Sequence, residues 1–85
     1  MADHILKTWP EYFEAVIDGK KKFELRENDR DYALGDTLWL HEWDPDRKER
    51  TGRVALAYVT YMMKGGKFGL PDNLAIMSIE LGESE

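Results

Sequence analysis

The sequence predicts a small α+β domain that is mainly β: an antiparallel barrel or curled sheet with one helix near the N-terminus packed against it. Two observations lead to this prediction. Apolar residues recur with helical spacing only before Gly19, and the later segments are short alternating or apolar runs bounded by polar turns. A chain of 85 residues has the length of one domain, so we expect residues 1–85 to fold as a single unit.

The N-terminal elements are predicted to be a short strand and a helix. Residues 4–7 read as the strand, and Thr8, Pro10 and Glu11 then match a capping box with Thr8 as the N-cap. Gly19 predicts the end of the helix, because glycine adopts the left-handed conformation at little cost. The apolar residues between these signals share one helical face: Trp9, Tyr12, Phe13, Val16 and Ile17.

The rest of the chain is predicted to consist of strands joined by polar turns. The strands are expected at residues 22–26, 37–43, 53–63 and 75–81, and the turns at 35–36, 44–52 and 65–69. In the segment 53–63, apolar residues occupy both the odd and the even positions, so both faces of the strand are apolar. We therefore expect it to be central and either strongly bent or shared between two sheets.

Composition excludes several classes of protein and site. The chain has no cysteine, which excludes disulfides, thiolate zinc sites and cysteine nucleophiles. No apolar run approaches the roughly 20 residues of a membrane span, and the first residues lack the apolar core of a signal peptide. We expect a cytoplasmic protein that has no membrane partner and needs no cofactor.

Charge is unevenly distributed along the chain. The net charge of −5 argues against a protein that grips duplex DNA, since such proteins are usually basic. Residues 20–30 depart from this balance, because they hold five basic and three acidic side chains. A small anionic ligand of nucleotide size fits this pattern better than a long nucleic acid.

The strand within this segment carries charge on one face. Alternation places Glu24 and Arg26 on one side and Phe23 and Leu25 on the other. Lys21 has the opposite parity to Glu24 and can join it only from the turn before the strand. If the charged face lines a cleft, it offers an acceptor and a planar donor fork that suit a base edge or a phosphate. On charge alone, a solvated face with ordinary cross-strand pairs is the simpler interpretation.

Histidine and tryptophan offer further candidates. His4 and His41 are the only histidines, and neither H-x-H nor i,i+4 spacing joins them, so we expect no metal site. His4 is expected to line a pocket or fix a hydrogen bond, and His41 to lie on a half-exposed sheet face. Trp39 and Trp43 share a face, from which they either stack on a base or fill the core.

Gly19-x-Lys21-x-x-Glu24-x-Arg26 resembles the G-x-K-x-x-E-x-R signature of the ASCH superfamily, relatives of the PUA RNA-binding fold. The flanking residues resemble a compact phage and bacterial branch of uncharacterised function, and the likeness spans most of residues 4–81. The resemblance implies a PUA-like antiparallel β-barrel in which the signature lines a cleft between helix and barrel. The flanking segments that carry it are residues 4–7, 9–13, 28–32, 35–36 and 42–45.

The resemblance implies an RNA or nucleotide-like ligand. Lys21 and Arg26 would contact a phosphate or a base carbonyl, and Glu24 would accept a hydrogen bond from an exocyclic amine. Asn28 and Arg30 would lie at the rim. The ligand-binding residues predicted in this way are Lys21, Glu24, Arg26, Asn28, Arg30 and His4.

Two other functions stay open at this point. In a small hydrolase acting on a modified nucleoside or RNA, Lys21 and Glu24 would be the catalytic pair. Acetylcytidine amidohydrolases of the superfamily carry a lysine matching Lys21, but they have a threonine nucleophile where this chain has Glu24, which ranks the hydrolase second. The third possibility is a module that binds a protein partner through its acidic surface.

Overall fold

The computed structural model describes residues 1–82 of the chain. It confirms a mainly-β fold with one short helix near the N-terminus. The elements in chain order are β1 (Asp3–Thr8), α1 (Pro10–Ile17), β2 (Phe23–Glu27), β3 (Thr37–Asp44), β4 (Glu49–Lys64) and β5 (Leu74–Leu81).

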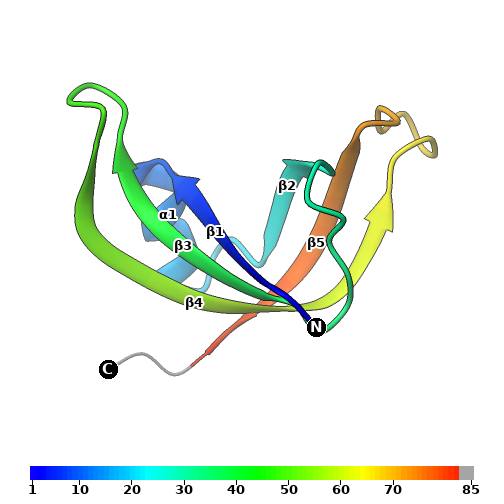
Figure 1. Cartoon of the computed structure of the whole chain (residues 1–85), viewed down its shortest axis with the longest axis horizontal. Coiled ribbons are helices and arrows are strands. Elements are labelled where there is room, and N and C mark those ends of the chain that lie inside the picture. Colours follow the sequence, from blue (N-terminus) through cyan, green and yellow to red (C-terminus); the bar gives the residue numbers. More distant parts are fainter. Residues whose placement is uncertain (83–85) are drawn as a thin grey trace.

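The five strands form one curled sheet in the order β1-β3-β4-β5-β2. Figure 1 shows that this sheet makes a trough, with β4 along its base and the edge strands β1 and β2 on opposite sides. The sheet is therefore a half-barrel, and the barrel expected from the sequence is only partly present. The pairing is also not antiparallel throughout, because β1 runs parallel to β3. That pairing is possible because α1, β2 and the loop after β2 form a long crossover between the two strands.

Strand β4 is the element that curls the sheet. It pairs with β3 along its first half and with β5 along its second half, which confirms the prediction of a central, bent strand. The register shifts opposite residues 41–43 and again between residues 59 and 61, and such irregularities increase local bending. The polar loop predicted at 44–52 is shorter than expected, because Glu49 and Arg50 pair with the end of β3.

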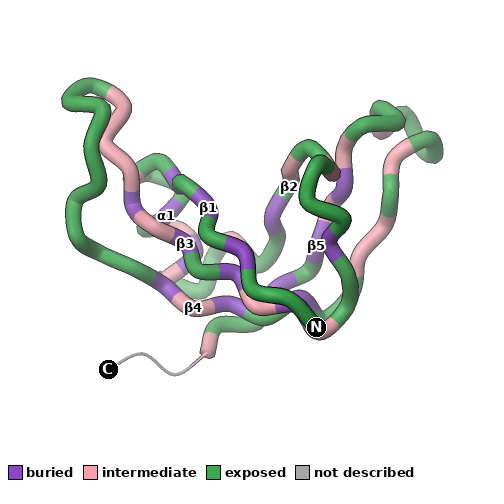
Figure 2. The backbone as a smooth tube through the Cα atoms, in the orientation of Figure 1, coloured by how far each residue is buried: buried purple, intermediate pink, exposed green. Residues whose placement is uncertain are grey.

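The core lies at the base of the trough, where α1 packs against β3. Figure 2 shows buried positions gathered there, while the ends of the β3–β4 and β4–β5 hairpins are mostly exposed. We call these two hairpin ends the arms. The buried cluster is mainly aliphatic and comprises Leu6, Phe13, Val16, Tyr32, Leu38, Leu40, Ala55, Ala57, Val59, Met77 and Ile79.

The start of α1 differs from the predicted capping box. The N-cap is Trp9, whose carbonyl accepts hydrogen bonds from the N–H groups of Tyr12 and Phe13, and no side chain caps the helix. Thr8 instead continues β1 opposite Glu42 in the parallel ladder. The predicted end of the helix is confirmed: α1 stops at Ile17, and Gly19 follows with a φ of +76°, a conformation that favours glycine.

Candidate functional site

An open cleft of about 620 Å³ lies between α1 and the edge strand β2. Its walls come from four consecutive parts of the chain: the end of β1, the first turns of α1, the turn after α1, and β2. Because these parts are close in sequence, the cleft is largely built by the first third of the chain. Its lining residues are Lys7, Thr8, Trp9, Tyr12, Ala15, Lys20, Lys21, Phe23, Glu24, Leu25 and Arg26.

Strand β2 has its charged face directed inward. Glu24 is only 2% exposed, whereas its apolar neighbours Phe23 and Leu25 are 45% and 48% exposed. The interpretation of a solvated charged face is therefore wrong. A strand normally buries its apolar side, so this inversion needs partners that make burial of the carboxylate tolerable.

Two cations provide those partners. The Lys21 ammonium donates to Glu24 Oε2 at 2.6 Å, and Arg26 Nε donates to Glu24 Oε1 at 2.9 Å. Lys21 lies before β2, in the turn that follows α1. The sequence predicted that Lys21 could reach Glu24 only from this turn, because within the strand the two residues would lie on opposite faces. Lys21 also donates to the carbonyl of Phe23 at 2.7 Å, and Arg26 Nη2 donates to the Thr8 hydroxyl at 3.2 Å.

This network prepares the two cations to meet a ligand. Each oxygen of Glu24 already accepts from one cation, so the carboxylate fixes the positions of both cationic groups. Lys21 and Arg26 remain 16% and 24% exposed, so solvent and ligands can reach them. With Lys7 and Lys20 the cleft holds four cationic side chains against one carboxylate, which makes it locally positive in a chain of net charge −5.

Aromatic rings form the opposite wall of the cleft. Trp9 and Tyr12, at the start of α1, are 51% and 47% exposed. Sequence reasoning placed both on the apolar face of the helix but did not select them as site residues. The usable signal was the width of that apolar face, because Phe13, Val16 and the partly buried Ile17 already make the contact with the core. Lys20 was also not selected, although it adjoins Lys21.

Three predicted site residues lie outside the cleft and close the gap between the edge strands. Arg30 Nη1 donates to the carbonyl of Ile5 on β1 at 2.8 Å. Asn28 Oδ1 accepts from the backbone N–H of Tyr32 at 3.2 Å. His4 lies edge-on to the ring of Tyr32, with the ring centroids 4.7 Å apart. The structure thus brings Lys21, Glu24 and Arg26 together at the cleft and uses the other three residues to hold the loop after β2.

Asp36 anchors this closure. Its carboxylate accepts from His4 Nε2 at 2.8 Å, from the Ala2 N–H at 2.9 Å and from the Ala33 N–H at 3.0 Å. Burial raises the pKa of Asp36, but the three hydrogen bonds outweigh burial and hold the pKa below its usual value of 3.8. Burial raises the pKa of Tyr32, against the opposing effect of Arg30 and Arg26, so this ring stays neutral near pH 7.

The Asp36→Asn variant is expected to be less stable than the wild type by about 1.5–3 kcal/mol at pH 7, since it loses hydrogen bonds to a charged group. Because the folded pKa is lowered, the contribution of Asp36 is complete above its unfolded pKa and is lost as the pH falls through the folded value. Urea unfolding between pH 7 and about pH 2.5 should therefore show the difference shrinking below about pH 4. The exposed Asp29→Asn is the control, and a difference for Asp36→Asn that did not vary with pH would contradict this account.

The remaining aromatic and histidine candidates do not contribute to the cleft. Trp39 is 37% exposed, and Trp43 lies beneath the Lys7 ammonium, 4.0 Å from the ring centroid. Neither belongs to the buried core cluster. His41 is half-buried on β3. Within residues 1–82, no three His, Asp or Glu side chains gather in a way that could hold a metal ion.

The sequence profile of the family described as "Domain of unknown function (DUF3850)" matches residues 3–79. This chain belongs to the DUF3850 family. The match includes every residue that lines the cleft. The DUF3850 chain is also similar to the "Uncharacterized 12.9 kDa protein in GpA 3'region" of Escherichia phage P2, with 52% identity over 40 residues. These residues are 47% of this chain and 37% of the phage protein, so the chain matches well under two thirds of that relative.

These findings confirm the prediction of an uncharacterised family with a phage relative. In the described part of the DUF3850 chain, no helix is long and apolar enough to span a bilayer.

Proposed function

We propose that this DUF3850 domain binds a nucleotide, or one nucleotide of a short RNA, in the cleft between α1 and β2. The observation that carries the proposal is the buried Glu24 with a cation on each oxygen, facing exposed aromatic rings. A buried carboxylate with two cations adds little to stability compared with apolar packing. Its value lies in holding Lys21 and Arg26 at fixed positions.

The size and chemistry of the cleft suit such a ligand. A volume of about 620 Å³ lies within the roughly 300–1,000 Å³ of small-molecule sites. Trp9, Tyr12 and Phe23 offer π-faces, and the stacking of a base on such a ring is worth about 1–3 kcal/mol. The excess of positive charge attracts a phosphate. The ASCH-like signature supports the proposal, because Lys21, Glu24 and Arg26 all line the cleft.

The structure suggests a different role for Glu24 from the one the resemblance implied. Instead of accepting from an exocyclic amine, Glu24 acts as a positioning residue that orients its two cations. Lys21 and Arg26 then present their remaining N–H groups to the ligand. Within residues 1–82, Arg26 Nη1 makes no hydrogen bond to another residue, which leaves it available to a phosphate or a carbonyl group.

The proposal is tested by a thermal-shift screen with nucleosides, modified nucleosides, nucleotides and short RNAs. A ligand at 100 times its dissociation constant should add about 2.7 kcal/mol of stability. Lys20→Ala should weaken binding of the phosphate-bearing ligands about five- to tenfold, a loss of roughly 1–1.4 kcal/mol. The matched control is Lys22→Ala, because Lys22 is also exposed but does not line the cleft, and its removal should leave the affinity unchanged.

Each outcome of this screen leads to a decision. Equal losses for the two lysine variants would mean that nonspecific charge attracts the ligand and that the cleft does not bind it. If no compound shifts the unfolding temperature, the proposal fails, and a protein partner becomes the next hypothesis. Any ligand that does bind should then be incubated with the protein and examined for hydrolysis, which tests the catalytic role of Lys21 and Glu24.

A further inference from the structure

Phe68 is the most exposed aromatic side chain of the described residues. It lies in the loop between β4 and β5, and 91% of its surface is exposed. Its φ of +52° lies in the left-handed region, which is unfavourable for a residue that carries a Cβ. Exposure forfeits the gain from burying the ring, and the backbone adds strain. Features that oppose stability in this way are typical of residues retained for function.

The loop around Phe68 is held in a defined shape. The N–H of Gly65 donates to the Leu74 carbonyl at 2.8 Å, and the N–H of Gly66 donates to the Leu70 carbonyl at 2.7 Å. A Cβ at position 65 would overlap the carbonyl oxygen of Pro71, so only glycine allows this close approach. The exposed ring is therefore presented from a preorganised loop, which lowers the entropy cost of contact with a partner.

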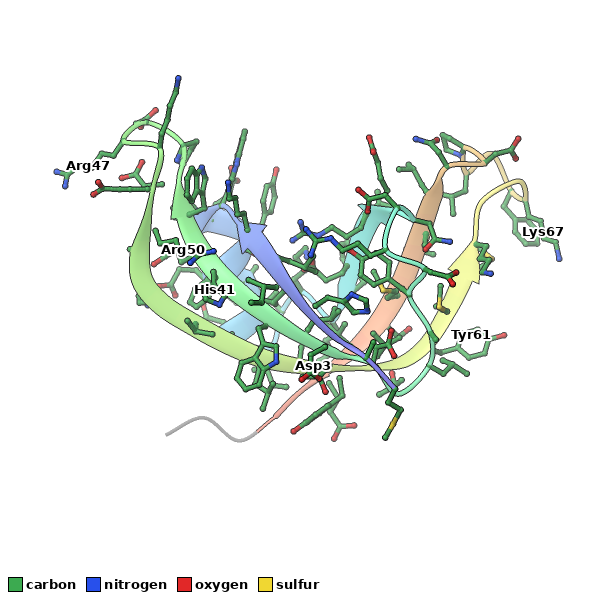
Figure 3. The ribbon with its side chains drawn as sticks, in the orientation of Figure 1. Asp3, His41, Arg47, Arg50, Tyr61 and Lys67 are labelled. Carbon is green, nitrogen blue, oxygen red and sulfur yellow. The ribbon has the colours of Figure 1, made fainter. Side chains whose placement is uncertain are left out.

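Positive charge accompanies the ring. Lys64 and Lys67 precede Phe68 in sequence and are both exposed. Figure 3 shows Lys67 at the outer end of its arm, directed away from the sheet. The arm is continuous with the cleft strand, because β5 pairs with β2 and the N–H of Asn28 donates to the Asn73 carbonyl at 2.8 Å. The strand β2, which lines the cleft, is therefore joined through β5 to the base of the arm.

We propose that the loop of residues 65–69 is a second contact for a single-stranded nucleic acid, in which a base stacks on Phe68 and Lys64 and Lys67 neutralise neighbouring phosphates. The proposal rests on the proposed function, because it extends the nucleotide of the cleft into a short strand. Stacking on aromatic rings together with cationic contacts to the backbone is how proteins bind single strands without sequence preference. In a chain of net charge −5, favourable contact with a polyanion is confined to places where cations gather.

A lipid bilayer fits the arm less well. One ring at the tip of a loop buries little apolar surface, and stable attachment to a membrane needs a larger apolar face or a polybasic patch. A single strand needs only a π-face and a few cations, which the loop has. The small apolar area of the arm therefore favours the single strand.

The test is fluorescence anisotropy with a labelled RNA of about 12 nucleotides, within the 4–16 nucleotides that small single-strand-binding folds cover. Phe68→Ala should weaken RNA binding about 5- to 150-fold without lowering the unfolding temperature. Phe68→Trp should retain binding, whereas Phe68→Leu, which is apolar without a π-face, should behave as alanine does. Lys67→Ala should reduce the slope of log K against log salt by about 0.7. Ile5→Ala, a change at an exposed apolar residue on β1 (52% exposed), is the control.

Mononucleotide binding separates this proposal from the function of the cleft. We expect Phe68→Ala to leave mononucleotide affinity unchanged, and Lys20→Ala to reduce it. If the RNA binds wild type and Phe68→Ala equally, or does not bind at all, the loop proposal is overturned even where mononucleotides bind. If the RNA binds through Phe68 while Lys20→Ala leaves RNA binding unchanged and mononucleotides do not bind, the loop is supported and the cleft proposal fails. If Phe68 is needed for binding to vesicles of anionic lipid and the RNA does not bind, the loop proposal is overturned in favour of a membrane contact.

Discussion

Replacing Phe13 by alanine is expected to lower the free energy of unfolding by about 3–5 kcal/mol. Phe13 is 2% exposed and belongs to the buried cluster that joins α1 to the sheet. Only Val16 of α1 is buried with it, so little else on the helix can fill the cavity. A domain of this length has a total stability of roughly 4–13 kcal/mol, and the variant would therefore be close to unfolding. Urea unfolding at 25 °C measures the loss.

The neighbouring Tyr12→Ala provides the control for this prediction. Tyr12 lies on the same helix but is 47% exposed and lines the cleft, so its removal should cost less than about 1 kcal/mol. Its expected effect is on ligand affinity, since it removes one aromatic wall. Similar losses of stability for the two variants would contradict the division of the helix face into a core part and a cleft part.

Glu24→Ala is expected to cost about 3 kcal/mol, the lower end of the range for breaking a buried ion pair. The change leaves Lys21 and Arg26 beside each other without the carboxylate that they share at 2.6 and 2.9 Å. The partial exposure of both cations, 16% and 24%, lets water compensate part of the loss. The variant should also lose ligand affinity, because neither cation is then held at the cleft.

Two further variants show whether the burial of Glu24 is the cause of the stability loss expected for Glu24→Ala. Glu24→Gln keeps the shape but only one of the two acceptor oxygens, so its loss of stability should lie between those of the alanine variant and the wild type. Glu27→Ala removes an exposed carboxylate from the same strand and should change stability by no more than about 0.5 kcal/mol. If Glu24→Ala were as stable as Glu27→Ala, the inward direction of the charged face would be wrong. Ligand affinity is compared at a temperature where all variants remain folded.

Local sequence signals were sufficient to locate the elements. Alternation and turn residues predicted all five strands within a few positions, and Gly19 marked the end of the helix. The continuous apolar character of residues 53–63 predicted the long central strand, although the structure covers only one of its faces: Ala55, Ala57 and Val59 are buried, while Val54 and Tyr58 are 43% and 42% exposed. These signals work because they depend on backbone geometry over a few residues.

The start of the helix shows where such signals fail. Thr8, Pro10 and Glu11 form a valid capping pattern, yet Thr8 extends the parallel ladder with β3 and its hydroxyl accepts from Arg26. Pairing with a strand about thirty residues further along the chain therefore overrides a local cap. The same limit applies to Asn28, Arg30 and His4, whose hydrogen bonds close the gap between β1 and the loop after β2.

The sequence by itself determined which residues of β2 share a face, and with Lys21 in the turn it identified the charged residues that meet at the cleft. Only the tertiary structure decided that the charged face is the buried one. Alternation distinguishes two faces of a strand but does not say which one points inward. Burial of Glu24 became tolerable because the turn after α1 brings Lys21 to one oxygen, while Arg26, bonded to Thr8 on the opposite edge strand, occupies the other.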